Sequence, residues 1–390
     1  MFSDQAVKSS NEDLFDRKHF SERIAQIIAS RTEKESIVIG VHAPWGEGKT
    51  SVLNMIVEKL GEHIEKKNNT LLDGHIVLLK FNPWRFSDEN QLLENFFFAL
   101  AEKLDDKIET NGEKIADLVR KYAWVSSPLE AFKVGFFGVD ASLNVEETLK
   151  KLSEAKPKAD ISTLKERIEK ILSESSKKIV VIMDDIDRLD KEEIQAIFRL
   201  VKLSADFPNT IYILSFDMER VSEALAEKYG TKEAGKSFLE KIIQLSLPLP
   251  PLASNKLIKL TSDNINKLLN DNKIELPKNE DIEWSYFFFS TFGSYLKSPR
   301  LVKKFINNLW FSMSDAKDEL NLFDLQTIEG VHTFFPDLYE IIRSNKNVFL
   351  LEPSNQFLRE KEENEHLEKL KKIVEGFPEH QKTAIEPVCS

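Results

Sequence analysis

The chain has 390 residues, of which 41% are hydrophobic and 31% are charged, so it is long enough for roughly two or three domains with sizeable cores. The formal net charge of −11 disfavours nucleic acid as a partner without excluding local contacts. The single cysteine, Cys389, excludes a disulfide within the chain. Since the N-terminus does not resemble a signal peptide and no apolar run of about 18 residues occurs, we expect a cytoplasmic protein without transmembrane helices.

The first predicted element is an amphipathic helix over 14–28, in which one face is expected to carry Phe20, Ile24, Ile27 and Ile28. An apolar, β-branched stretch over 36–41 follows and predicts a strand. A helix just before this strand either packs beside a bound base or covers an edge of the sheet. The sequence leaves both placements open.

The stretch after this strand has the pattern of a phosphate-binding loop. Its residues are Pro44, Trp45, Gly46, Glu47, Gly48, Lys49, Thr50 and Ser51. Gly46 and Gly48 allow backbone conformations that turn N–H groups towards phosphate oxygens at a helix N-terminus. Lys49 would add a charge for the β- and γ-phosphates, and the Thr50 hydroxyl could ligate Mg²⁺. Ala43 replaces the first glycine of the strict pattern, but the flanking strand and helix still predict a nucleotide site.

A second strand is predicted over 75–81, and Pro83 ends it. Trp84 and Arg85 follow at the carboxyl end of this strand, where α/β sheets bind ligands. We expect Trp84 to be buried in the core. Arg85 either contacts phosphate or a neighbouring subunit, or has no role in the site.

Residues 88–176 predict a helical insertion between the second and third strands. Within it, the stretch 122–139 is rich in aromatic and small residues, but Glu130 and Lys133 make it too charged to span a bilayer. This stretch either docks on a partner or on the inner face of a membrane, or forms the local core of the insertion. The sequence leaves these alternatives open.

The third predicted strand, 178–183, runs directly into acidic residues. Asp184 could hold Mg²⁺ directly or through water, and Asp185 is then placed to orient a water for attack on the γ-phosphate. The other interpretation is that the acids at 184–187 cap the helix that starts near Lys191. Because the strand end and the Gly-Lys-Thr loop both lie at carboxyl ends of strands, together they indicate one site.

A buried strand is predicted over 210–217, with Ser215 and Asp217 as candidate sensors of the γ-phosphate. Asp217 could instead cap the helix that begins at Met218. Prolines at 248–251 mark the boundary between the expected domains. We expect a P-loop NTPase core over 1–250 and a C-terminal helical lid or interaction domain over 251–390.

Five motifs in this order resemble the KAP family of P-loop NTPases, a branch close to the AAA+ and STAND ATPases. They lie at 44–50, 81–86, 184–189, 238–244 and 299–308. The resemblance covers about 14–310. It implies an α/β fold with an additional-strand parallel sheet flanked by helices, a helical lid, and ATP hydrolysis with Mg²⁺.

The resemblance also implies roles for single residues. Lys49 would be a phosphate-binding group, Thr50 and Asp184 would be Mg²⁺ ligands, and Asp185 would be the acid that orients water. In the lid, the basic sensor would be one of two residues, Arg300 or Lys303. Arg188 would be an arginine that acts on a neighbouring subunit.

These expectations amount to a Mg-dependent ATPase that couples ATP binding and hydrolysis to conformational change in a protein partner or a homo-oligomer. Bacterial members of the family occur in phage-exclusion settings, so a role in anti-phage defence is implied by analogy. The alternative is a nucleotide-gated scaffold that binds ATP with little turnover and recruits a protein, membrane or nucleic-acid partner.

Overall fold

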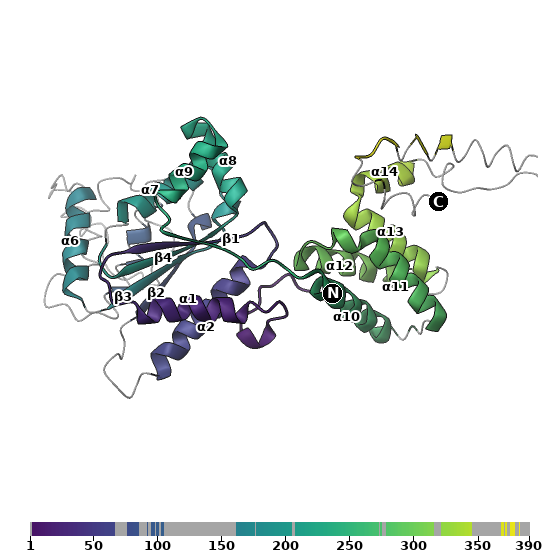
Figure 1. Cartoon of the computed structure of the whole chain (residues 1–390), viewed down its shortest axis with the longest axis horizontal. Helices are drawn as coiled ribbons and strands as arrows, with labels where there is room; N and C mark the ends of the chain where they lie inside the picture. The colour runs from purple at the N-terminus through teal and green to yellow at the C-terminus, as the bar shows by residue number, and fades with distance from the viewer. Residues whose placement is uncertain are drawn as a thin grey trace, which may run out of the picture. The chain divides into compact units, whose positions relative to one another are not determined.

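The computed structural model describes most of the chain outside the predicted insertion (Figure 1). The described ranges are 2–66, 76–85, 161–175, 177–204, 207–272, 278–315 and 321–344, with isolated residues at 92–104, 274 and 368–382. The stretch 122–139, for which partner or membrane docking is one alternative, lies outside the described residues.

The chain divides into two compact units. One comprises Val7–Trp45 and Lys49–Pro250, and we call it the sheet unit. The other comprises Met1–Ala6, Gly46–Gly48 and Pro251–Ser390, and we call it the helical unit. The division after Pro250 falls at the proline-rich stretch.

The sheet unit is built on five parallel strands in the order β2-β3-β4-β1-β5. Their bounds are Ile37–His42 for β1, Ile76–Phe81 for β2, Lys178–Met183 for β3, Thr210–Phe216 for β4 and Leu245–Pro248 for β5. Strand β4 lies between β1 and β3, and all seven of its residues are buried. The predicted additional-strand parallel sheet is therefore confirmed, because β4 separates the strand before the loop from the strand before the acids.

Helices cover both faces of this sheet (Figure 1). Alternate strand residues enter two cores: Val180 and Ile182 of β3 face α1 and α2, whereas Val181 and Met183 face the core shared with α7 and α8. The helices are α1 (Lys18–Ser30), α2 (Lys49–Lys66), α6 (Ile161–Glu174), α7 (Lys191–Ser204), α8 (Met218–Tyr229) and α9 (Lys232–Glu240). Short 3₁₀ turns lie at η1 (Ser10–Glu12), η2 (Pro83–Arg85) and η4 (Ile186–Arg188).

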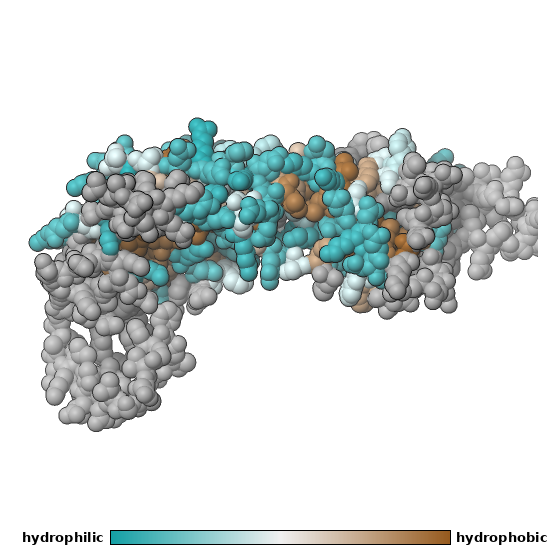
Figure 2. Space-filling model, turned by 90° about the horizontal axis from the view of Figure 1, so that it is seen from below, coloured by the Kyte–Doolittle hydropathy of each residue, from teal (hydrophilic) through white to brown (hydrophobic). Residues whose placement is uncertain are grey.

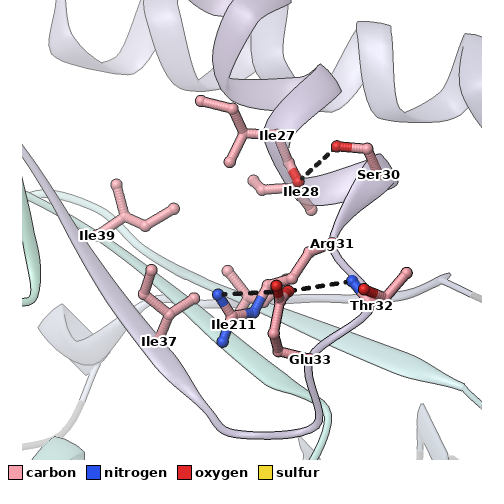
Figure 3. A pocket seen from close by; sticks show the side chains of 9 residues that line it. All are labelled: Ile27, Ile28, Ser30, Arg31, Thr32, Glu33, Ile37, Ile39 and Ile211. Carbon is pink, nitrogen blue, oxygen red and sulfur yellow. Dashed lines mark hydrogen bonds and ion pairs between the residues drawn. The ribbon is translucent and has the colours of Figure 1, made fainter.

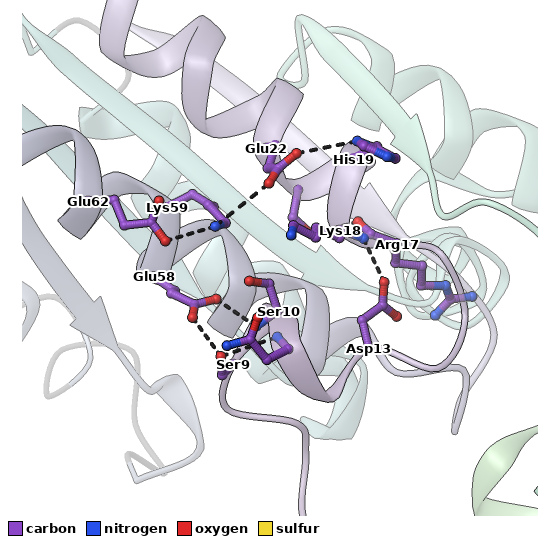
Figure 4. A network of polar contacts seen from close by, with 12 residues as sticks. Ser9, Ser10, Asp13, Arg17, Lys18, His19, Glu22, Glu58, Lys59 and Glu62 are labelled. Carbon is purple, nitrogen blue, oxygen red and sulfur yellow. Dashed lines mark hydrogen bonds and ion pairs between the residues drawn. The ribbon is translucent and has the colours of Figure 1, made fainter.

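Polar contacts fix α2, the helix that follows the loop (Figure 4). The Glu58 carboxylate accepts hydrogen bonds from the Ser9 hydroxyl at 2.7 Å and the Ser10 amide at 2.6 Å. Lys59 pairs with Glu62 at 2.8 Å and with Glu22 of α1 at 3.7 Å. The start of the sheet unit and α1 therefore hold the helix that presents the loop.

The helical unit contains α10 (Ser254–Asp271), α11 (Lys278–Phe292), η5 (Gly293–Tyr295), α12 (Pro299–Asp315), α13 (Leu322–Phe334) and α14 (Pro336–Ser344). Its core is aromatic. Phe288 and Phe292 of α11 are fully buried, and the Phe288 ring lies 5.0 Å from that of Phe305 on α12. The helical character predicted for the C-terminal part is thus seen in its described residues.

The face drawn in Figure 2 is mostly hydrophilic, with hydrophobic residues in small separate patches. Trp84, Tyr286 and Phe311 are large hydrophobic residues that are more than half exposed, at 60%, 79% and 65%. Among the residues that the structure describes, none of the helices has the length and apolar character that a membrane crossing requires.

Candidate nucleotide site

The loop between β1 and α2 contains two glycines in the left-handed region. Gly46 and Gly48 have φ angles of 86° and 90°, which residues with a side chain rarely adopt. Ala43, by contrast, does not have a positive φ, and its side chain is buried in the core beneath α1 and α2. The position where the strict pattern has glycine can hold alanine here because its methyl group packs without demanding an unusual backbone.

Lys49 is the first residue of α2 and is almost fully buried. Its Nζ donates to the carbonyl oxygen of Ala43 at 3.0 Å and to Oδ2 of Asp187 at 3.3 Å. Asp187 lies on η4, just after β3, and is 1% exposed. The structure therefore brings the loop and the acidic segment together, as predicted, but the acid that contacts Lys49 is one that the sequence did not single out.

Asp184 and Asp185 are both partly exposed at the end of β3. The Asp185 backbone is left-handed, with φ 58°, and its amide donates to Oδ1 of Asp184 at 2.8 Å. Burial raises the pKa of the Asp185 carboxyl, and the neighbouring Asp184 raises it further, whereas Arg188 lowers it. Oδ1 of Asp185 pairs with Nε of Arg188 at 2.9 Å. In this state Arg188, the predicted subunit-bridging arginine, engages the acid of its own chain.

The alternative interpretation of these acids as a helix cap is wrong. The cap of α7 is Asp190, whose Oδ1 accepts from the Glu193 amide at 2.8 Å, while the Glu193 carboxylate accepts from the Asp190 amide at 2.9 Å. The acids at 184–187 therefore do not cap α7.

Asp217 does take the capping role that the sequence left open. Its Oδ1 accepts from the amides of Glu219 at 3.0 Å and Arg220 at 3.4 Å, at the start of α8. Ser215 is fully buried near the end of β4, and within the described part of the chain its hydroxyl has no partner. Their role as phosphate sensors stays a prediction.

Trp84 is not in the core, contrary to the expectation from sequence. It is 60% exposed, and its indole N–H donates to the carbonyl oxygen of Arg188 at 3.4 Å. The reason is that Pro83 begins a 3₁₀ turn directly after β2, which redirects the backbone before Trp84 can follow the strand into the core. The side chain of Arg85 lies outside the described residues.

Ser51 contacts the chain itself. Its hydroxyl accepts from the Val7 amide at 3.1 Å, and Asn54, one helical turn on, donates to the Val7 carbonyl oxygen at 3.0 Å. In the helical unit, Arg300 lies in the first turn of α12 and forms an ion pair with Asp4. Lys303 lies on the same helix and is partly exposed. A contact of Arg300 or Lys303 with nucleotide stays a prediction.

The residues at this edge of the sheet fit a nucleotide with Mg²⁺. Oδ1 of Asp187 and Oγ of Ser215 are buried without a partner among the described residues, although buried polar atoms are normally hydrogen-bonded. Mg²⁺ prefers oxygen ligands and is usually held by one or two carboxylates plus substrate phosphates. Asp184 and Thr50 would supply those protein oxygens. Within the described ranges no three acidic, histidine or cysteine side chains form a metal cage, and a Mg-nucleotide site of this kind requires none.

A cavity of about 310 Å³ lies elsewhere, between the end of α1 and the start of β1 and β4 (Figure 3). Ile27, Ile37 and Ile211 line it together with Arg31. Ile37 is the first residue of β1, whereas the loop follows the last, so the cavity is at the opposite end of this strand and does not belong to the predicted nucleotide site.

Comparison with known proteins places the chain in a family. The model of the KAP family P-loop domain matches residues 17–313. The phage T7 exclusion protein of Escherichia coli (strain K12) is 27% identical over 359 residues, which cover 86% of this chain and 47% of that protein. The chain therefore spans about half the length of this relative.

Solved structures with some likeness include the Aeropyrum pernix ORC2 protein, with a TM-score of 0.41 and 13% identity over 85% of this chain and 70% of that one. The Cdc6p protein of Pyrobaculum aerophilum has a TM-score of 0.37 and 11% identity over 78% and 63%. Since the family model matches well over half of the chain, and the loop and the acidic strand end meet at one edge of the sheet, this protein belongs to the KAP family of P-loop NTPases.

Proposed function

We propose that the chain is a Mg-dependent ATPase that uses ATP binding and hydrolysis to change the conformation of a protein partner or an oligomer. The single observation that carries this proposal is the contact between Lys49 of the loop and Asp187 of the acidic segment, 138 residues apart in sequence. It supports one polar site at the carboxyl edge of the sheet, containing both halves of a P-loop NTPase centre.

The chemistry follows from groups at this edge. The loop amides and Lys49 would hold the β- and γ-phosphates, and Thr50 and Asp184 would hold the magnesium ion, which neutralises charge on the phosphates when it is bound. Asp185 would accept a hydrogen bond from the attacking water and orient it in line with the leaving oxygen. Because Arg188 occupies one carboxylate oxygen of Asp185, that ion pair must loosen, or the other oxygen must act.

Two substitutions test the proposal. Lys49→Ala should weaken ATP binding by roughly tenfold or more, because a charge-assisted hydrogen bond to phosphate contributes about 1.5–3 kcal/mol. Asp185→Asn should leave binding nearly unchanged and lower turnover by roughly 10²–10⁴-fold, the range for loss of a general base. Binding is measured with a fluorescent ATP analogue and turnover by phosphate release. Glu192→Gln, an exposed acid on α7, serves as the control. Absence of Mg-dependent phosphate release by the wild type would refute the hydrolysis part.

The second candidate function is a nucleotide-gated scaffold that binds ATP with little turnover. The observation in its favour is that Asp185, the proposed base, is held in a 2.9 Å ion pair with Arg188. The same measurements separate the two functions. A wild type that binds the analogue tightly and releases no phosphate, with Asp185→Asn behaving like it, would select the scaffold.

We further propose a role in defence against phage, for which the support is the name of the Escherichia coli relative, a phage T7 exclusion protein. Because the chain spans only 47% of that relative, the activity of the whole relative does not transfer automatically. The proposal therefore needs a test in infected cells.

A further inference from the structure

Lys49 and Asp187 form a buried ion pair. Their side chains are 7% and 1% exposed, and Nζ lies 3.3 Å from Oδ2. An ammonium group has three N–H donors. Those of Lys49 reach two acceptors in the described part of the chain, the Ala43 carbonyl oxygen and Asp187. A buried lysine needs a counter-charge, and among the described residues Asp187 supplies it.

One carboxylate oxygen of Asp187 lacks a hydrogen bond in the part of the chain that the structure describes. Oδ1 of Asp187 is buried and has no hydrogen-bond partner within the described residues. A carboxylate can accept at both oxygens, so Asp187 holds Lys49 with only part of its capacity. Such a pair is strong enough to neutralise the ammonium group, yet another anion that offers more acceptors could replace it.

A nucleotide brings such an anion. Under the proposed function, the β- and γ-phosphates enter the loop and offer several charged oxygens to Lys49. They would compete with Asp187 for the same N–H donors. The carbonyl oxygen of Ala43 is part of the loop backbone and can remain an acceptor in both states.

We infer that Asp187 is a positioning residue that acts through Lys49: it neutralises the buried ammonium group when the loop is empty, and phosphate displaces it. This inference rests on the proposed function, because it concerns the same nucleotide site. It differs from the role of Asp184 as a metal ligand and of Asp185 as a base, since Asp187 opposes nucleotide binding and needs no contact with it.

The test is the affinity of Asp187→Asn for a fluorescent ATP analogue. Asparagine keeps the shape of the side chain but removes its charge, so phosphate no longer competes with a carboxylate for Lys49. We expect binding to tighten roughly tenfold, the equivalent of one charge-assisted hydrogen bond. A residue with only a structural role would weaken binding or leave it unchanged. The control is again Glu192→Gln, which removes one negative charge from the exposed start of α7. A similar gain in this control would overturn the inference.

The outcomes separate the two proposals. A wild type that does not bind the analogue would refute the proposed nucleotide site. A wild type that binds it, with a folded Asp187→Asn that binds equally or more weakly, would refute only the role of Asp187.

Asp187→Asn could also fail to fold, because it leaves the ammonium group of Lys49 buried without its counter-charge. The double variant Lys49→Met with Asp187→Asn then decides by a thermal unfolding scan without nucleotide. Cooperative unfolding of the double variant would support the inference, because removal of both charges then restores folding. An unfolded double variant would overturn it, since Asp187 would then be needed for reasons unconnected with Lys49.

Discussion

Asp185 combines an unusual backbone with an unusual environment. Its φ of 58° lies in the left-handed region, and its carboxyl is partly buried beside Asp184. Burial and the like charge of Asp184 raise its pKa, and Arg188 counteracts them. Since a general base works only when ionised, this environment sets the pH below which the proposed hydrolysis stops.

The pH dependence of turnover should therefore reveal the ion pair with Arg188. Removing Arg188 by Arg188→Ala takes away the group that lowers the Asp185 pKa, so the acid limb of the pH–turnover profile should move to higher pH. The measurement is phosphate release by wild type and variant from acidic to neutral pH. Identical acid limbs would mean that Asp185 does not act as the base or that the pair is absent in solution.

The Asp185 carboxyl also affects the stability of the fold. Its contribution to the free energy of unfolding changes with pH in the direction opposite to that of most carboxyl groups. A pKa raised in the folded chain means that the folded state binds the proton more tightly. Ionising Asp185 therefore lowers the free energy of unfolding as the pH rises above the ordinary value of 3.8 and through the raised pKa. Asp185→Asn should lack this component, because asparagine does not titrate.

Helices α8 and α9 pack very closely, and the residue of α9 at their contact is Gly235. A Cβ added at Gly235 of α9 would lie 2.5 Å from the backbone oxygen of Ser222 on α8. Real side chains do not come this close, so the two helices would have to separate. Residues of α8, α9 and β4 pack in the same core. A separation of α8 from α9 would therefore also disturb the packing against β4.

We expect Gly235→Ala to lower the free energy of unfolding by about 1–3 kcal/mol, the range for overpacked contacts. The matched control is Gly61→Ala on α2, where nothing lies within 4 Å of the added Cβ. In a helix interior that change should stabilise by up to about 1 kcal/mol. Urea unfolding of the two variants measures the difference. A Gly235→Ala variant as stable as the wild type would show that α8 and α9 are not this tightly packed.

Elements whose signals are local could be predicted from the sequence. The loop, the strand before it and the acid-bearing strand each follow from a short pattern, and the resemblance that the ordered motifs carry implies the additional-strand sheet. The contact of Lys49 with Asp187 could not be predicted, because a 3₁₀ turn decides which of three neighbouring acids is buried. The one available signal in the sequence was the presence of Asp187, because a metal ligand and a base account for only two of the three acids.

Trp84 and the cap of α7 show two further limits. The sequence predicts a buried Trp84, but a turn at Pro83 redirects the chain and leaves the ring exposed. Asp190 is the cap, and a glutamate three residues later was the sequence signal that distinguishes it from the acids of the site.

At the scale of the whole molecule, the question is whether a chain that spans 47% of the Escherichia coli relative carries an activity of its own against phage. If ATP binding drives that activity, cells expressing the wild type should give fewer phage T7 plaques than cells expressing Lys49→Ala. Plaque counts on the two strains, at matched protein levels, measure this. Equal counts would contradict the defence proposal, and they would leave the ATPase proposal to be judged by its own assay.

The left-handed backbone of Asp185 bears on how such a protein can change during descent. Asparagine and aspartate are the non-glycine residues that adopt this conformation most readily, whereas other side chains lose roughly 1–2 kcal/mol there. Under the proposed function, a single substitution of Asp185 to asparagine would therefore lower turnover by roughly 10²–10⁴-fold without straining the backbone. A protein that hydrolyses ATP and one that only binds it would then differ by one substitution at Asp185. Evolution could convert one into the other without a change in the backbone.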